Sequence, residues 1–271
     1  MILDDQGLIA IGDASLEYRM IGPRPDAAPT IVMLHEGLGA ATTWGDFPKA
    51  IAENTGAGVL VYARAGYGKS STVKLPRPLD YMQREATQVL PQLLDAIGFK
   101  RGILLGHSDG ATIAAYYAGS VQDHRVRGLI LMAPHFFMER SNIEAIRNTI
   151  TAYETTDLRA KLARHHADVD TAFRGWSGAW LDPGFLNFDT TDALAYIRVP
   201  VLVIQGAADP YGTLAQVRVV EEECYCPVET LVLEDVGHAP HREKPAETLG
   251  AVAEFADQIF RVHHEGVENA A

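Results

Sequence analysis

The sequence reads Gly102-Ile103-Leu104-Leu105-Gly106-His107-Ser108-Asp109-Gly110 near the middle of the chain. Its beginning is a short apolar run, which is typical of a buried strand. The small residues that follow, from Ala111 to Tyr116, are typical of a helix packed close to a neighbour. Gly106 and Gly110 lack a Cβ atom, so strand and helix can approach each other there. The pattern predicts a sharp strand-to-helix turn that presents Ser108 at the end of the strand.

The serine in this turn has two interpretations. It is either an incidental residue of a glycine-rich turn or the nucleophile of a G-x-S-x-G motif, a pattern that also arises by chance. The strand–turn–helix context favours the nucleophile. A serine hydroxyl is a weak nucleophile, however, and it needs a base within hydrogen-bond reach and a group that orients the base. The nucleophile interpretation therefore requires partners elsewhere in the chain.

Short apolar runs alternate with helical patterns on both sides of Ser108. Runs typical of buried strands occupy residues 31–34, 58–63, 126–133, 199–204 and 229–233, and residues 8–21 are typical of a hairpin with a turn at Gly12-Asp13. Helical spacing of apolar residues predicts helices at 44–55, 86–97, 213–223 and around 249–260. Alternating strands and helices predict an α/β fold with a mostly parallel sheet and helices on both faces.

Candidate site residues follow three of these strands. Asp209 lies just after the run at 199–204, and His238 lies just after the run at 229–233. The glycine-rich stretch Gly37-Leu38-Gly39 comes soon after the run at 31–34. Open parallel sheets place their sites at the carboxyl ends of the strands. The order Ser, Asp, His is also the order associated with G-x-S-x-G turns, so these residues are expected to meet at one edge of the sheet.

The pattern changes between residues 135 and 195. This segment has few β-branched runs, several short helical stretches and two of the three tryptophans, Trp176 and Trp180. We interpret it as a helical cap inserted into the strand–helix series. The predicted division is therefore a core in two parts, 1–134 and 196–271, with the cap insertion at 135–195.

The chain resembles the α/β-hydrolase superfamily from about residue 14 to residue 262. The residues that carry the resemblance are Gly106-His107-Ser108-Asp109-Gly110, Asp209, His238 within the stretch 237–245, and the glycine-rich loop at 64–70. The resemblance implies a mostly parallel eight-stranded sheet flanked by helices. It also implies a nucleophile at Ser108, an acid at Asp209 and a base at His238. A serine at this position disfavours the epoxide hydrolases and haloalkane dehalogenases of the fold, which need an aspartate there.

The tetrahedral intermediate of acyl transfer needs two fixed N–H donors. One is expected from the backbone of Asp109. Counting from His35 makes Gly37 the second donor, whereas matching the family's glycine makes it Leu38. Here the chain departs from the family, because Glu36 separates His35 from the glycines. We expect its carboxylate to point away from the oxyanion, toward an ion pair with Arg64.

Other residues of the same types are weaker candidates. His35 and His241 are alternative bases, although His35 is more typical of a structural loop histidine and His241 is less well spaced from its strand. Asp182, Asp189 and Asp192 are alternative acids, but they lie in the insertion and are expected at the surface. The pair His165-His166 fits no defined metal site. Neither a metal nor an organic cofactor is implied.

The function that these residues predict is hydrolysis of a carboxylic ester of a small, mostly apolar substrate through an acyl-enzyme. Leu38, Trp176 and Trp180 are the predicted substrate-binding residues, and Arg64, Arg140 and Arg174 are candidates to bind a substrate carboxylate. Two alternatives stay open. The same residues cleave carbon–carbon bonds or lactones in this fold, and the fold also occurs in non-catalytic small-molecule binding proteins.

Composition limits the partners. The net charge of −12 argues against nucleic acid or an anionic membrane, since both attract clustered Lys and Arg. The chain has no apolar run of transmembrane length, and the segment 1–7 has no signal-peptide pattern. Cys224 and Cys226 are too close for an unstrained disulfide and predict reduced thiols in a cytoplasmic protein. A small-molecule substrate is the expected partner, and the sequence leaves open whether the chain forms a homo-oligomer.

Overall fold

The computed structural model describes residues 3–268, and the side chains of residues 3–261. Within this part of the chain, eight strands form a single sheet in the order β1-β2-β4-β3-β5-β6-β7-β8. Their bounds are β1 (Gln6–Ile11), β2 (Ala14–Ile21), β3 (Thr30–Leu34), β4 (Gly58–Tyr62), β5 (Gly102–His107), β6 (Val126–Met132), β7 (Val201–Gly206) and β8 (Val228–Leu233). The predicted fold class and its eight-stranded sheet are confirmed.

The sheet is parallel except at one edge. Strands β1 and β2 form the predicted hairpin, with Ile11 opposite Ala14, and β2 pairs antiparallel with β4. From β4 to β8 all neighbouring strands are parallel. The carboxyl ends of these strands therefore lie at the same end of the sheet, where the candidate residues lie.

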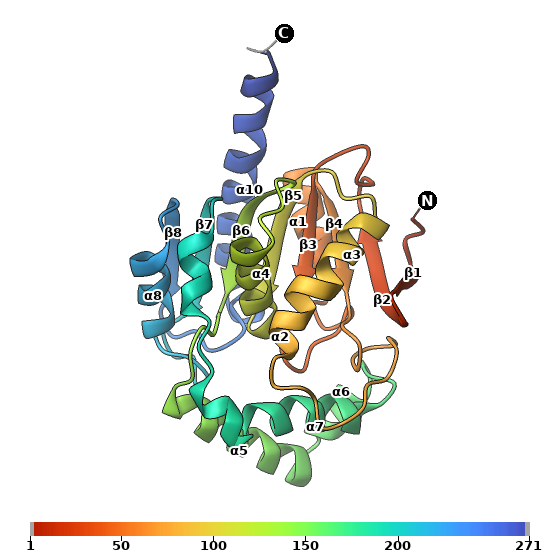
Figure 1. Cartoon of the computed structure of the whole chain (residues 1–271), viewed down its shortest axis with the longest axis vertical. Coiled ribbons are helices and arrows are strands. Elements are labelled where there is room, and N and C mark those ends of the chain that lie inside the picture. The colour runs from red at the N-terminus through yellow and green to blue at the C-terminus, as the bar shows by residue number, and fades with distance from the viewer. Residues whose placement is uncertain (1–2, 269–271) are drawn as a thin grey trace.

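Helices cover both faces of the sheet (Figure 1). One face packs against α1 (Phe47–Thr55) and α10 (Pro245–Glu268), and the other packs against α3 (Leu90–Ala96), α4 (Asp109–Ser120) and α8 (Ala215–Glu223). Because successive side chains of a strand point to opposite faces, Ile103 and Leu105 enter the first core and Leu104 enters the second. This double burial explains why the inner strands β3 to β7 are nearly continuous apolar runs, unlike the edge strand β8.

Three predicted elements differ from the structure for local reasons. Helix α1 begins at Phe47 rather than at residue 44, since Gly45 has a φ of 59° that a helix excludes. Strand β7 begins at Val201, just after Pro200, which has no N–H for the ladder. The helix predicted at 86–97 is divided, because Pro91 interrupts its hydrogen bonds. Its first part continues α2 (Tyr81–Arg84) as a π-helical turn, η1 (Glu85–Val89), before α3.

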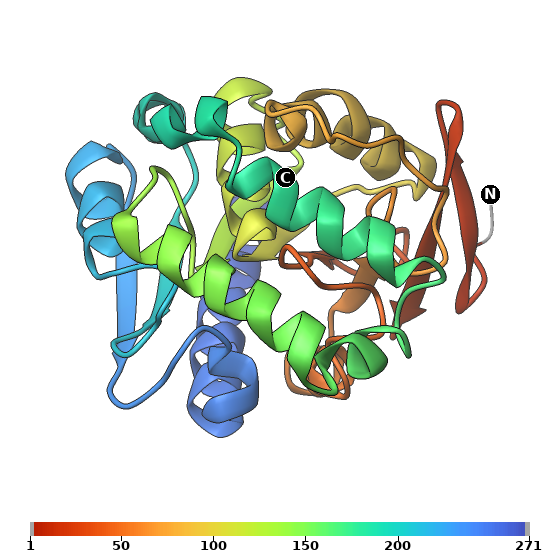
Figure 2. The same cartoon turned by 90° about the horizontal axis from the view of Figure 1, so that it is seen from below.

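Helices fill the connection between β6 and β7. They are α5 (Arg140–Thr155), α6 (Leu158–Leu162), α7 (Val169–Trp180) and the 3₁₀ turns η2 (Pro183–Asn187) and η3 (Thr191–Tyr196). Figure 1 shows α5, α6 and α7 beyond one end of the sheet, and Figure 2 shows α5 and α7 running across that end. Asp168 caps α7 by accepting the N–H of Thr171. The helix buries Phe173, Trp176 and Trp180 on its inner side.

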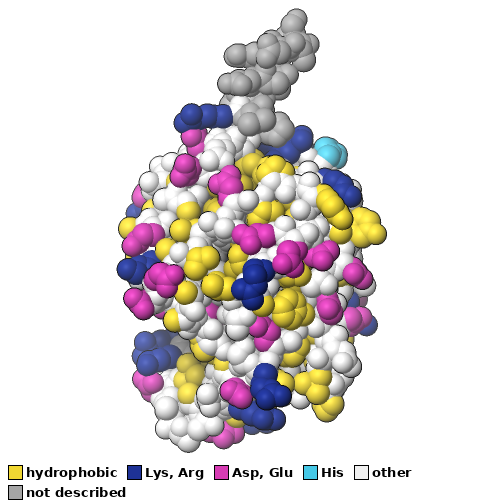
Figure 3. Space-filling model, turned by 90° about the vertical axis from the view of Figure 1, so that its left-hand side faces the viewer, with side chains coloured by type: hydrophobic (Ala, Val, Ile, Leu, Met, Phe, Trp, Pro, Cys, Tyr) yellow, Lys and Arg dark blue, Asp and Glu magenta, His cyan; other side chains and the backbone are white. Residues whose placement is uncertain are grey.

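The surface carries both signs of charge. On the face shown in Figure 3, Lys and Arg side chains are separated from one another, with Asp and Glu among them. Within the part of the chain that the structure describes, no helix combines the length and the apolar character needed to cross a membrane. Cys224 and Cys226 are both free, in agreement with the expected thiols.

Candidate active site

The turn at Ser108 is as sharp as its glycines predict. A Cβ atom on Gly106 would lie 2.2 Å from the carbonyl oxygen of Gly110, so β5 and α4 nearly touch. A Cβ atom on Gly110 would lie 2.0 Å from the carbonyl oxygen of Leu34, so α4 also presses against the end of β3. Larger residues are excluded from both positions. The turn therefore brings Ser108 against the loop that follows β3.

Ser108 itself has a strained backbone, with φ 54° and ψ −120°. Such a conformation costs about 1–3 kcal/mol in a residue other than glycine and persists where surrounding contacts enforce it. Its N–H donates to Met132 O of β6 at 2.8 Å, and its carbonyl accepts the N–H groups of Ala111 and Thr112 in α4. The strand and the helix thus fix this residue from both sides.

His238 and Asp209 lie together at the ends of β8 and β7. The His238 Nδ1 donates to Asp209 Oδ2 at 2.8 Å, which leaves Nε2 as the nitrogen available to Ser108. The Asp209 carboxylate also accepts from the Gln205 side chain at 3.0 Å and from the Tyr211 N–H at 2.8 Å. Its burial opposes ionisation, but the charge and hydrogen bond of His238 outweigh burial and hold the pKa of Asp209 below its usual value.

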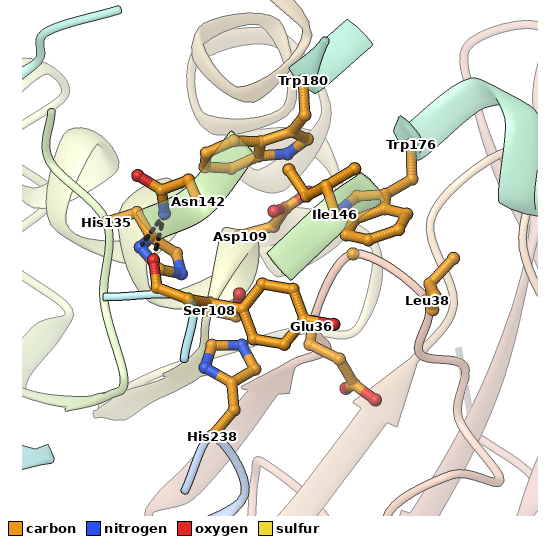
Figure 4. A pocket seen from close by; sticks show the side chains of 12 residues that line it. Glu36, Leu38, Ser108, Asp109, His135, Asn142, Ile146, Trp176, Trp180 and His238 are labelled. Atoms are coloured by element: carbon orange, nitrogen blue, oxygen red, sulfur yellow. Dashed lines mark hydrogen bonds between the residues drawn. The ribbon is translucent and has the colours of Figure 1, made fainter. Parts of the chain in front are cut away.

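Ser108 and His238 line a pocket of about 150 Å³ beneath the α5–α7 helices (Figure 4). Its walls are largely apolar, with Leu38 from the loop after β3, Ile146 from α5, and Trp176 and Trp180 from α7. Among the predicted site residues, Gly37 and Asp109 line it as well, and Asp209 lies behind His238. Figure 4 shows Leu38 and Trp176 on one side of the pocket and His135 and Asn142 on the other.

Residues 35–39, which we call the 35–39 loop, form a tight turn beside Ser108. The Gly39 N–H donates to Glu36 O, so Gly37 and Leu38 are the two central residues. A Cβ atom on Gly37 would lie 2.3 Å from the Trp176 ring, which shows that the indole packs directly on this glycine. The Leu38 carbonyl accepts from His166 Nε2 at 3.0 Å. Residues of the α5–α7 segment therefore fix the loop from above.

Arg64 fixes the same loop from below. Its side chain is fully buried and donates to the carbonyl oxygens of His35 and Glu36. The Arg64 N–H donates to His35 Nε2 at 3.0 Å, so the ring proton is on Nδ1, which donates to Glu36 O. Burial and the Arg64 charge lower the pKa of His35 well below its usual value. His35 is thus a neutral structural residue, as its position in the sequence predicts.

The predicted ion pair between the Glu36 side chain and Arg64 is wrong. Arg64 binds the Glu36 carbonyl, and its charge faces the Asp109 carboxylate at 3.6 Å. The Glu36 carboxylate lies instead 3.6 Å from His107 Nδ1 and 3.9 Å from the Arg242 guanidinium. Burial disfavours its charged form, but His107 outweighs burial and holds the pKa of Glu36 well below its usual value. Figure 4 shows the carboxylate directed away from Ser108.

The side chain of Asp109 links the turn to α7. Its carboxylate is fully buried and accepts from the Tyr81 hydroxyl at 2.5 Å, which in turn accepts from Trp180 Nε1 at 3.0 Å. The backbone N–H of Asp109 is different, because the first N–H groups of a helix have no acceptor within the helix. It is therefore available at the start of α4, beside Ser108.

The alternative candidates lie elsewhere or are occupied. His241 packs against Trp44 and His107, and burial lowers its pKa to about 3. Asp189 and Asp192 are exposed, and Asp182 accepts from Gly184 N in its own turn. Arg140 and Arg174 are exposed and are not part of the pocket lining. Within the described residues, no group of three or more His, Cys, Asp or Glu could hold a metal ion.

Sequence reasoning missed part of the pocket. His135, Asn142, Ile146 and Tyr211 line it as well. His135 had a usable signal, since it follows the end of β6 as the other site residues follow their strands. Asn142 and Ile146 lie on α5, whose placement over the sheet depends on long-range packing.

A comparison with known families agrees with this geometry. The sequence profile of the alpha/beta hydrolase family matches residues 31–251. The chain belongs to the alpha/beta hydrolase family. This hydrolase is 20% identical over 299 residues to epoxide hydrolase 3 of Xenopus tropicalis, covering 95% of the chain and 79% of that protein. It is 23% identical over 282 residues to a proline iminopeptidase of Lactobacillus helveticus, covering 89% of the chain and 94% of that protein.

Solved structures show the same fold. The enol-lactonase of Burkholderia xenovorans LB400 superposes with a TM-score of 0.71 at 20% sequence identity, covering 92% of this hydrolase and 99% of the lactonase. At such identities the likeness concerns the fold. The relatives act on different bonds, so the reaction of this hydrolase has to be argued from its own pocket.

Proposed function

We propose that this hydrolase cleaves a carboxylic ester of a small, mostly apolar substrate through an acyl-enzyme, with Ser108, Asp209 and His238 as its catalytic triad. One observation carries the proposal: the strained Ser108 lines an apolar pocket together with a histidine whose Nδ1 is paired with a buried carboxylate. Because acyl transfer uses a serine in this arrangement, a serine at 108 favours it over opening of an epoxide.

The mechanism follows from these positions. The Ser108 hydroxyl attacks the ester carbonyl while His238 Nε2 takes its proton, and Asp209 stabilises the imidazolium. His238 then gives this proton to the departing alcohol, which leaves the acyl group on Ser108. A water molecule attacks the acyl group, with His238 again as the base, and releases the carboxylic acid and the free serine.

Two backbone N–H groups would stabilise the oxyanion of each tetrahedral intermediate. Asp109 supplies the first from the start of α4, and Gly37 or Leu38 supplies the second from the 35–39 loop. Both regions are fixed before substrate binds, because Gly110 presses on β3 and Trp176 packs on Gly37. Donors that need no reorganisation during the reaction are the effective ones.

The size of the pocket supports a small substrate. A cavity of about 150 Å³ holds a molecule of roughly the size of benzene. Leu38, Ile146, Trp176 and Trp180 favour an apolar group there. We treat residues 135–195 as a cap over the two-part core, 1–134 and 196–271, which keeps bulk water from the acyl-enzyme.

A panel of substrates tests the reaction class. Activated esters of increasing acyl length, a lactone, a diketone and a proline anilide are assayed with the wild-type protein. We expect the short esters to have the highest kcat/KM. Preference for the diketone or the lactone would assign carbon–carbon or lactone cleavage, and turnover of none would favour a non-catalytic binding protein.

A pair of aspartate variants tests the triad. Asp209→Asn is expected to lower kcat about a thousandfold or more with little change in KM, because the imidazole loses its orienting charge. Asp189→Asn, which changes an exposed aspartate between η2 and η3, is the control and should keep the wild-type rate. A fully active Asp209→Asn protein would contradict the role of this residue.

A further inference from the structure

His135 is a buried histidine that the proposed mechanism does not use. It follows β6 through Ala133, whose φ of 46° is in the left-handed region, and Pro134. The residue is 2% exposed and lines the pocket beside His238, with the two rings stacked at 5.5 Å between centroids. Its carbonyl accepts from Thr112 Oγ1 of α4 at 2.6 Å. The backbone at the end of β6 thus holds this ring in the pocket wall.

Asn142 fixes which nitrogen of His135 carries the proton. The amide oxygen of Asn142 accepts from the Glu139 N–H at 2.5 Å in the cap of α5, which identifies the other amide atom as the nitrogen. That nitrogen donates to Tyr211 O and faces His135 Nδ1 at 3.4 Å. Since the amide nitrogen is a donor, Nδ1 of His135 accepts, and the ring proton is on Nε2.

The ring stays neutral in this position. Burial, together with the charge of His238, lowers the pKa of His135 to about 3. Gly212 covers the ring edge at Nδ1 and Cε1, because a Cβ atom on Gly212 would lie 3.0 Å from Cε1. Figure 4 shows the ring between Asn142 and the pair formed by Ser108 and His238.

The Nε2–H group of His135 is thus a fixed donor at the pocket. Among the hydrogen bonds of the described residues, none involves this nitrogen. Unlike the enclosed side-chain atoms that lack a partner, this nitrogen is accessible from the pocket, where an acceptor oxygen of a ligand can reach it. The accessible area of the pocket wall is largely apolar, so a polar group of a ligand finds few places to bind there.

We propose that His135 is a specificity-determining residue whose Nε2–H binds an acceptor oxygen of the substrate. The preferred substrates are then esters that carry a carbonyl or hydroxyl oxygen a short distance from the scissile bond, rather than plain alkyl esters. This inference rests on the proposed hydrolase function. The strained Ala133 and the Asn142 side chain act through His135, as positioning residues.

Matched variants and matched esters test the inference. His135→Gln keeps an N–H donor at similar reach, whereas His135→Met has a similar length and no donor. Two pairs of esters are assayed, one with a ketone in the acyl group and one with a ketone in the alcohol. In each pair, the ketone of one ester is an acetyl group. The other ester carries an isopropyl group at the same position. Ile146→Val changes the same pocket without a polar group, and it should affect both members of a pair alike.

In at least one pair, we expect His135→Met to lower kcat/KM for the ketone ester about fivefold to tenfold more than it lowers kcat/KM for the isopropyl ester. The loss should be mainly in KM, and His135→Gln should recover most of it. Equal losses for both members of each pair would overturn the inference. A fluorophosphonate label on Ser108 checks that each variant keeps its folded site.

A binding measurement separates this inference from the proposed hydrolysis. The Ser108→Ala protein is titrated with acetophenone and with isopropylbenzene by calorimetry, alone and combined with each His135 variant. Selective weakening of acetophenone by His135→Met, and not by His135→Gln, supports the donor whether or not esters are cleaved. Equal weakening of both ligands, or no binding of either, would overturn it even in an active hydrolase.

Discussion

Two residues with positive φ end neighbouring strands at the pocket. Ser108 follows β5 and Ala133 follows β6, and the main-chain N–H of each donates to the next strand. Backbone strain of about 1–3 kcal/mol per residue concentrates at functional sites, because a surrounding structure that tolerates it can aim side chains accurately. Here the strain aims the Ser108 hydroxyl directly and the His135 ring two residues later.

Glu36 is the residue at which this chain departs from its family's pattern. At an effective dielectric constant of about 20, two unit negative charges about 5 Å apart repel by about 3 kcal/mol, or roughly a hundredfold in rate. A carboxylate facing the oxyanion would therefore slow the reaction severely. Its contacts with His107 and Arg242 direct the charge elsewhere.

Glu36→Gln is accordingly expected to change kcat/KM by less than about threefold at pH 7, because it removes a charge that points away from the oxyanion. Ester hydrolysis by the two proteins under identical conditions checks this. A gain of tenfold or more in the variant would show that the native carboxylate repels the transition state.

At the scale of elements, close backbone approach connects β3, β5 and α4. Glycine at 106 and 110 removes the atoms that would separate them, and the 35–39 loop then lies against the start of α4. Ser108 follows β5, whereas the proposed second N–H donor follows β3. Their spacing therefore depends on this contact.

Gly110→Ala is expected to lower the free energy of unfolding by about 2 kcal/mol or more, because the new methyl group would overlap the Leu34 carbonyl. Gly178→Ala is the matched control. That glycine is exposed on α7, and a Cβ there meets nothing within 4 Å, so the variant should gain about 0.5–1 kcal/mol. Urea unfolding measures both, and equal effects would contradict the close approach.

The elements also show what can be predicted from the sequence. Apolar runs located the strands, and polar residues just after them located Ser108, Asp209 and His238, since parallel strands end at one edge. The partners of Glu36 could not be predicted, because they come from β5 and α9 (Pro240–Glu243) through contacts distant in the sequence. The same holds for Asn142, whose role depends on how α5 lies over the sheet.

At the scale of the whole molecule, buried neutral histidines link stability to pH. The pKa values of His135 and His241 are both lowered to about 3 by burial, whereas unfolded histidine titrates near 6.5. Below pH 6.5 the unfolded chain binds protons that the folded protein excludes. The stability present above pH 6.5 is therefore lost as the pH falls toward 3, by about 1.4 kcal/mol per pH unit for each such histidine.

His241→Phe removes one of these groups and keeps an aromatic ring beside Trp44 and Phe47. Between pH 6.5 and 4.5, we expect the variant to lose about 2 kcal/mol less stability than the wild-type protein. Urea unfolding at both pH values measures the difference. Identical losses would mean that His241 is not held neutral in the folded protein.

Every step of the proposed mechanism depends on Ser108 as the nucleophile. A fluorophosphonate probe reacts with a serine only where a base and an oxyanion site activate it, so intact mass and peptide mapping test this role directly. We predict one covalent label on the wild-type protein, located at Ser108, and no label on folded Ser108→Ala. An unlabelled folded wild-type protein, or a label on another serine, would contradict this role.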